Sequence, residues 1–197
     1  TDYHYTHGSN WGDIDNDGIL DIVVTSKNKH LYVFDQFGLK LDYYTNQYLV
    51  GTPALGNLDE DSDLEIVFGG FSGDAKLFAL NVDGSDVEGF PLLLDEKMQK
   101  GFALADFNDN GKDDIVLGTE DDNIYLIYDD GSIGFSFTTG DKIRSAPIII
   151  DTGNNKIIIA GSKDNKLYAL DQNGEIVFQF ESDDDIYTSP TVLETPT

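Results

Sequence analysis

One acidic nine-residue segment occurs three times in this chain, each time followed by a short apolar stretch. The first copy runs from Asp13 to Asp21 and is followed by Ile22, Val23 and Val24. Oxygen-bearing side chains stand at positions 1, 3, 5 and 9 of each copy. Alternate oxygens of this kind can surround one hard cation, and calcium accepts six to eight of them. The three copies cover residues 13–21, 57–65 and 106–114.

The copies recur at intervals of roughly 45 residues, the length of one four-stranded propeller blade. A shortened fourth copy begins at Asp151. Each unit has a short strand before the loop, an apolar strand after it, an alternating aromatic strand such as Lys166 to Leu170, a glycine turn and a closing strand. The apolar period of two indicates strands, and no window of helical length keeps a period of 3.6.

We therefore predict an all-β fold, a β-propeller of four four-stranded blades plus the first strand of a fifth. The N-terminal region already supplies the first strand of blade one, so a closed four-bladed ring has no place for the last strand. We expect a segment of a larger propeller of about six to eight blades. An open array, or a four-bladed ring with a displaced tail, is the alternative. The expected blades cover about residues 6–50, 51–100, 101–144 and 145–186, and the fifth starts within 187–197.

A start at Thr1, without methionine or a signal peptide, leads us to expect a mature product or an excised piece.

The loops predict about three calcium sites. An EF-hand is excluded because its bidentate glutamate at position 12 is replaced by Val24, Phe68 and Leu117. The predicted side-chain ligands are Asp13, Asp15, Asp17 and Asp21; Asn57, Asp59, Asp61 and Glu65; and Asp106, Asn108, Asn110 and Asp114. The backbone carbonyls of Ile19, Asp63 and Lys112 complete the sets.

Carboxylate number and glycine content predict that the loops differ in affinity. The first loop, with four aspartates and Gly18, is expected to bind calcium most tightly. The second has Ser62 in place of the glycine, which is unfavourable if that residue needs a positive φ. The third has only two ligating carboxylates and is expected to be weakest. The Asp151 loop has lost its acidic ligands, and we expect no metal there.

The Asp13–Asp21 loop between two strands, repeated in each blade, resembles the FG-GAP or VCBS repeats of the integrin α-subunit propeller. The segment from Lys166 to Asp171 also resembles PQQ-like propeller repeats. The resemblance implies a calcium-binding β-propeller with its metal loops on one face, secreted or on a cell surface. It implies no single function, because such propellers serve in adhesion, in carbohydrate binding and in enzymes.

The net charge and the absence of known catalytic motifs limit the classes of partner and enzyme that this chain could represent. A formal net charge of −25 argues against nucleic acid and anionic membranes as partners. No apolar run is long enough to insert into a membrane, and the absence of cysteine excludes disulfides. The sequence contains no nucleophile elbow, Walker loop or zinc signature. Because carboxylates are numerous, a catalytic pair like that of a glycosidase remains an alternative.

A few other side chains could bind a metal or a sugar in principle. We expect the three histidines to be surface or edge-strand residues rather than metal ligands, and Trp11 to be part of the core rather than a sugar platform. We expect the basic side chains at strand or blade starts to be solvated, and the acidic run before the fifth blade to be a solvated loop. These residues are His4, His7 and His30; Lys76, Arg144 and Lys166; and Asp183, Asp184 and Asp185.

The pattern as a whole predicts a calcium-stabilised, non-catalytic propeller that binds a protein or a glycan, as in adhesion. Its expected location is extracellular or on the cell surface, and the periplasm is an alternative. Further blades are expected in the same polypeptide. The alternatives are the propeller of a secreted polysaccharide lyase or quinone-dependent dehydrogenase, or a structural subunit of a surface assembly. A lyase needs basic residues on one face to neutralise uronate, and this chain has only 12 Lys plus Arg. A quinone enzyme needs Arg, Lys and Trp around its central funnel, and Trp11 is the single tryptophan.

Overall fold

Residues 8–153 and 155–191 are described by a computed structural model of the chain. Among them, sixteen strands form four antiparallel sheets of four strands each, in chain order within every sheet. The first sheet contains β1 (Asn10–Gly12), β2 (Asp21–Thr25), β3 (His30–Asp35) and β4 (Gly38–Tyr44). The second contains β5 (Ala54–Gly56), β6 (Glu65–Gly69), β7 (Lys76–Leu80) and β8 (Leu92–Leu93).

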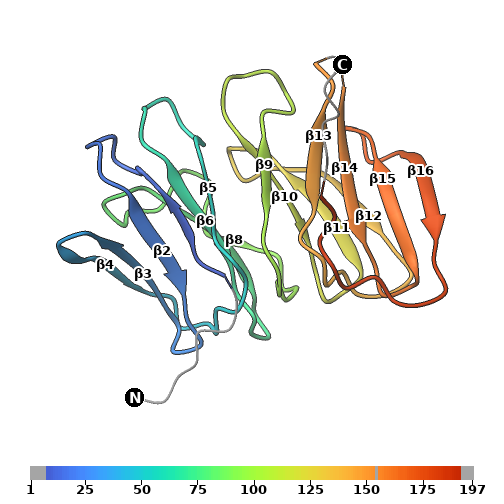
Figure 1. Cartoon of the computed structure of the whole chain (residues 1–197), viewed down its shortest axis with the longest axis horizontal. Helices are drawn as coiled ribbons and strands as arrows, with labels where there is room; N and C mark the ends of the chain where they lie inside the picture. The colour runs from blue at the N-terminus through green and yellow to red at the C-terminus, as the bar shows by residue number, and fades with distance from the viewer. Residues whose placement is uncertain (1–7, 154, 192–197) are drawn as a thin grey trace.

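The third sheet contains β9 (Ala103–Ala105), β10 (Asp114–Gly118), β11 (Asn123–Ile127) and β12 (Ile133–Thr138). The fourth contains β13 (Ile148–Asp151), β14 (Lys156–Gly161), β15 (Lys166–Leu170) and β16 (Ile176–Glu181). The sheets follow one another in a row, from the N-terminal to the C-terminal end of the chain (Figure 1). The predicted all-β propeller fold is confirmed, and each sheet falls within one of the expected blade ranges. No helix able to cross a membrane occurs among the described residues.

The hydrophobic core lies between neighbouring blades. Successive residues of a strand point to opposite faces of its sheet, so one strand can serve two cores. In β6, Ile66 and Phe68 pack toward blade 1, whereas Val67 packs toward blade 3. All five residues of β6 are buried as a result. Blades 3 and 4 share a third cluster that includes Val116 and Ile158.

The two outer faces of the row carry exposed apolar side chains. Trp11 is 65% exposed, so its predicted place in the core is wrong. Its equivalent in blade 2, Leu55, packs into the core shared with blade 1, whereas no described element precedes blade 1 to cover Trp11. At the other end of the row, Phe178 and Phe180 of β16 are 48% and 59% exposed.

The first strands β1, β5, β9 and β13 approach one another along the inner side of the row. A hollow of about 380 Å³ lies there. Ser189 joins this lining, and its hydroxyl accepts a hydrogen bond from the Ala146 N–H at 2.9 Å. Ser189 thus follows the repeat, since the equivalent residues of the four blades line the same hollow: Gly8, Thr52, Gly101 and Ala146.

The predicted first strand of a fifth blade falls partly outside the described residues. Residues 187–191 form no strand, and 192–197 are not described. The fifth blade therefore stays a prediction.

Candidate calcium loops

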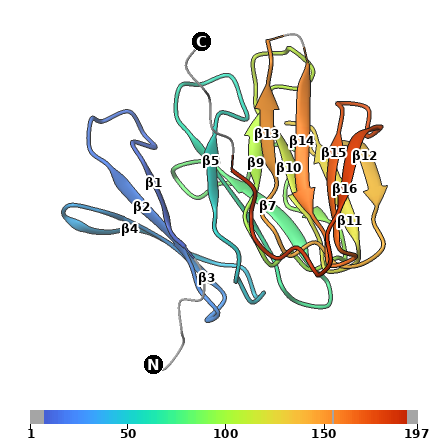
Figure 2. The same cartoon turned by 45° about the vertical axis from the view of Figure 1, so that its right-hand side comes forward.

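The three acidic segments connect the first and second strands of blades 1 to 3, and all lie along the same edge of the row, which is the upper edge in Figures 1 and 2. Each loop starts directly after a three-residue strand and finishes on the first residue of a five-residue strand. The strand pairing therefore brings the two ends of each loop together.

The carboxylate at position 9 is buried in all three loops, at no more than 1% exposure. One of its oxygens accepts a hydrogen bond from the backbone N–H of position 2, whose apolar side chain is itself buried. This contact fastens the start of the loop to the second strand. The pairs are Asp21 with Ile14 at 3.3 Å, Glu65 with Leu58 at 2.5 Å and Asp114 with Phe107 at 2.7 Å.

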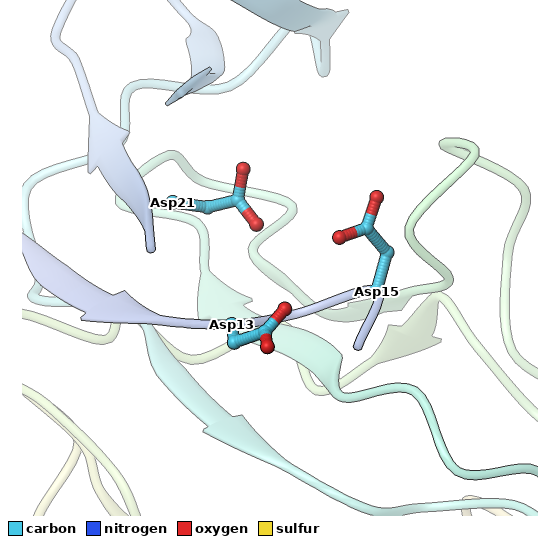
Figure 3. A group of neighbouring side chains, drawn as sticks. All are labelled: Asp13, Asp15 and Asp21. Atoms are coloured by element: carbon cyan, nitrogen blue, oxygen red, sulfur yellow. The ribbon is translucent and has the colours of Figure 1, made fainter. Parts of the chain in front are cut away.

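The first loop brings Asp13, Asp15 and Asp21 together, with one carboxylate oxygen of each within 4.8 Å of the others (Figure 3). The buried Oδ1 atom of Asp15 has no hydrogen-bond partner among the described groups. Asp17 is exposed and does not belong to this group. Its Oδ1 instead accepts the N–H of Ile19 at 2.7 Å.

The second loop groups Asp59, Asp61 and Glu65 in the same way. Two of its buried oxygens, Asn57 Oδ1 and Glu65 Oε1, have no hydrogen-bond partner among the described groups. Burial raises the pKa of Glu65 to about 7 against the hydrogen bond from Leu58, and the charges of Asp59 and Asp61 act in the same direction as burial. A cation among these oxygens would remove that electrostatic penalty.

The third loop has two carboxylates, Asp106 and Asp114, with amides at positions 3 and 5. The two oxygens of Asp106 accept the backbone N–H groups of Asn110 at 3.1 Å and Gly111 at 2.7 Å. Burial raises the pKa of Asp114 to about 6, although backbone N–H groups of Phe107 and Asp129 donate to it. This loop is thus held largely by its own hydrogen bonds.

The loops have two backbone conformations. Gly18 and Gly111 have φ of +84° and +87°, and position 4 is also left-handed, with φ of +52° at Asn16 and +58° at Asp109. In the second loop, Ser62 is not among the residues with positive φ. The serine therefore meets no left-handed strain, and the cost expected for it does not arise.

Hydrogen bonds connect each loop to the next. The N–H of Leu64 donates to the carbonyl of Ile14 at 2.9 Å, and the N–H of Asp113 donates to that of Asn57 at 2.6 Å. The three loops are thus joined along the edge of the row by backbone contacts.

The fourth turn is closed without acidic ligands. The backbone N–H and the hydroxyl of Thr152 both donate to the carbonyl of Asn155, at 3.0 and 2.9 Å. The N–H of Gly153 donates to Asp151 at 2.6 Å. The expectation of no metal here stays a prediction.

The remaining sequence candidates lie apart from the loops. His30 binds Asp42 and stacks on Tyr32, while His4 and His7 lie outside the described residues. Lys76 and Lys166 are half-buried at the starts of β7 and β15. Asp183 and Asp184 are exposed, and Asp185 pairs with Lys163 at 3.4 Å.

Arg144 is not a freely solvated residue, as the sequence suggested, but pairs with Glu120 at 2.7 Å. Lys40, which no sequence pattern indicated as a site residue, lies 2.8 Å from Asp15 and 3.0 Å from Asp21. Neither pairing has a local sequence signal, because 24 residues separate Arg144 from Glu120 and 25 separate Lys40 from Asp15.

Four consecutive four-stranded sheets, with cores between them and acidic loops along one edge of the row, define this molecule as a β-propeller. Residues 76–192 match the family model described as the lambda-carrageenase beta-propeller domain. The match covers more than half of the chain, which therefore belongs to that family. No curated protein sequence matches the chain.

Solved structures share the fold at low sequence identity. BamB from Moraxella catarrhalis has 18% identity and a TM-score of 0.69, over 96% of this chain and 55% of its own. BBS1N in complex with ARL6DN has 14% identity and a TM-score of 0.68, over 92% and 58%. The V. cholerae biofilm matrix protein Bap1 has 16% identity and a TM-score of 0.67, over 89% and 28%. The chain thus spans less than two thirds of each of these structures.

Proposed function

We propose that this chain is a calcium-stabilised propeller module that works outside the cytoplasm, binds a glycan or protein partner, and has no catalytic role of its own. The observation that supports calcium best is Glu65, whose buried Oε1 lacks a partner beside Asp59 and Asp61. Three carboxylates so close together repel one another, and a divalent cation offsets that repulsion. An all-oxygen donor set of carboxylates, an amide and a carbonyl suits calcium better than softer metals.

Thermal unfolding in EGTA and in millimolar calcium tests the metal. Calcium should raise the midpoint, because a ligand of the folded state stabilises it by about 2.7 kcal/mol at one hundred times its dissociation constant. Glu65→Gln should remove most of that rise. Glu60→Gln is the matched control, since Glu60 is an exposed residue of the same loop. A wild-type midpoint that does not respond to calcium would contradict the proposal.

A polysaccharide is the partner class that the family membership favours, because the family is named after lambda-carrageenase. Affinity electrophoresis in gels with lambda-carrageenan, with a neutral polysaccharide, and with none tests this. Slower migration in one polysaccharide gel, relative to a non-binding marker protein, is the expected result. Equal mobility in all three gels would argue against a glycan as the partner and in favour of a protein.

The second candidate is the propeller part of a secreted polysaccharide-degrading enzyme, which the same family match supports. In that case the catalytic residues lie elsewhere in a longer polypeptide. The chain alone should release no reducing ends from lambda-carrageenan. Measurable cleavage by the purified chain, lost in a carboxylate variant of that same chain, would contradict the non-catalytic role.

Additional blades are part of the proposal. The exposed apolar residues Trp11 and Phe180 lie at opposite ends of the row of blades, on sheet faces equivalent to those that neighbouring blades cover. Ser189 lines the inner hollow at the position that the repeat gives to a fifth blade. Both features support a larger propeller in which this chain supplies about half of the ring.

A further inference from the structure

The three buried carboxylates at position 9 differ in what their second oxygen contacts. In blade 3, Asp114 Oδ1 accepts the backbone N–H of Asp129 at 3.0 Å. In blade 2, Glu65 Oε1 has no partner among the described groups. In blade 1, Asp21 Oδ1 accepts a hydrogen bond from the ammonium of Lys40 at 3.0 Å. The loops therefore differ in the oxygen that remains available to a bound cation.

The Lys40 ammonium already acts as a cation in the first loop. It lies 2.8 Å from Asp15 Oδ2 as well as 3.0 Å from Asp21 Oδ1, and its side chain is 24% exposed. The ammonium, which a lysine carries at neutral pH, thus lies between two of the three carboxylates that the loop brings together.

A β-bulge places this lysine. In the pairing of β3 with β4, Val33 faces Leu41 and Phe34 faces Leu39, so Lys40 is the extra residue. A bulge changes the direction of the side chain at that point. The same irregularity in blades 3 and 4 leaves Gly134 and Val177 as the extra residues.

Blade 2 has no such irregularity among its described pairs, because β8 is short and pairs only at Leu92 and Leu93. Among the described blades, a lysine at the bulge therefore occurs only in blade 1.

We propose that Lys40 is the built-in cation of the first loop, so that blade 1 is held without calcium and calcium binds first in the second loop. Calcium would need to approach within 2.3–2.6 Å of oxygens that the ammonium already contacts. Two positive charges so close repel strongly at a partly buried site, so calcium could enter only after displacing the lysine. This order reverses the ranking that carboxylate number predicts. The inference rests on the proposed function, because it requires calcium in the second loop.

Calcium titration calorimetry on four proteins tests the inference: wild type, Glu65→Gln, Lys40→Met and Lys166→Met. The methionine removes the ammonium and keeps much of the apolar stem. Lys166→Met is the matched control, because Lys166 is a half-buried lysine of β15 with no ion pair among the described residues. The third loop is unchanged in all four proteins, so differences between them do not depend on it.

Glu65→Gln should lose the tightest wild-type site. Lys40→Met should bind one additional calcium ion, and the dissociation constant of the first loop should fall by about tenfold or more. A change of this size is expected because one charge-assisted hydrogen bond no longer competes with the metal. Lys166→Met should bind calcium as the wild type does. In EGTA, Lys40→Met should unfold at a lower temperature than Lys166→Met, and calcium should reduce or remove that difference.

Asp15→Asn provides a second test that does not depend on the folding of Lys40→Met. It should leave the number and affinity of bound calcium ions at the wild-type values. Loss of one calcium ion in Asp15→Asn, or no additional ion in Lys40→Met, would overturn the inference about Lys40. The proposed function would still hold in that case, provided that the wild type binds calcium tightly and Glu65→Gln loses this binding. Absence of calcium binding by every variant would overturn both.

Discussion

Arg144 donates two hydrogen bonds to Glu120, from Nε to Oε1 and from Nη2 to Oε2, each at 2.7 Å. Burial opposes ionisation of Glu120, but the hydrogen bonds and charges of Arg144 and Lys142 outweigh it and lower the pKa of the carboxyl. Glu120 follows the second strand of blade 3, and Arg144 immediately precedes blade 4. The ion pair therefore fastens the segment that leads into blade 4 to the end of β10 in blade 3, at the edge of the row opposite the acidic loops.

Arg144→Met should lower the free energy of unfolding by about 1–3 kcal/mol, because it leaves a nearly buried carboxylate without its main partner. Lys142→Met should cost less than about 1 kcal/mol, since Lys142 is more exposed and lies 3.3 Å from Glu120. Urea unfolding at neutral pH measures both. Equal losses in the two variants would contradict the dominant role of Arg144.

The same ion pair predicts a pH dependence. Because the pKa of Glu120 is lowered in the folded state, its stabilisation is present above the unfolded pKa of about 4.3 and is lost as the pH falls through the lower folded pKa. The stability difference between wild type and Arg144→Met should therefore be constant near neutral pH and shrink below about pH 4.3. Urea unfolding across that range checks this, and a gap that widens in acid would contradict it.

Phe68 is the test of the core between blades 1 and 2. It is fully buried and stacks on Phe78 at a ring distance of 4.9 Å. Phe68→Ala should destabilise the fold by about 3–5 kcal/mol through lost burial and a residual cavity. Phe37→Ala, at a residue that is 81% exposed, should change stability by less than about 0.5 kcal/mol. Denaturant unfolding compares the two, and a small loss at Phe68 would contradict a shared inter-blade core.

The two loop conformations predict different responses to alanine at position 6. Gly18 has φ of +84°, and a Cβ there would meet no atom within 4 Å, so only backbone strain opposes Gly18→Ala. We expect a loss of about 1 kcal/mol. Ser62→Ala should stay within about 0.5 kcal/mol. Thermal unfolding in EGTA measures both without the contribution of calcium, and similar losses would mean that the two loops share one conformation.

Trp11 reports on the blades that are proposed to precede blade 1. It is the single tryptophan of the chain and is 65% exposed, so acrylamide should quench its fluorescence efficiently in this chain. If additional blades cover that face, quenching should weaken several-fold in the longer polypeptide, measured with any added tryptophans replaced by phenylalanine. Equal quenching in both proteins would show that the face stays open.

The sequence predicted those parts of the fold that depend on residue patterns within short segments of the chain. Alternation in segments such as Lys166–Leu170 specified strands, and the acidic segments located the hairpin between the first two strands of each blade. The grouping of Asp59, Asp61 and Glu65 also follows from their spacing, because a tight loop between paired strands brings positions 3, 5 and 9 together. The left-handed conformation at Gly18 could be expected from the glycine itself.

The tertiary structure decided features that depend on neighbours distant in sequence. Trp11 has the same place in the repeat as Leu55, yet within residues 8–153 and 155–191 a preceding blade covers Leu55 alone. Lys40 reaches Asp15 and Asp21 because a bulge in β4 turns it toward the loop. Arg144 meets Glu120 because the segment that leads into blade 4 passes the end of β10. Spacing within the chain fixes which carboxylates gather in a loop. Whether a lysine or a metal ion neutralises them depends on side chains from other strands, because electrostatic interactions depend on distance in space and not on separation along the chain.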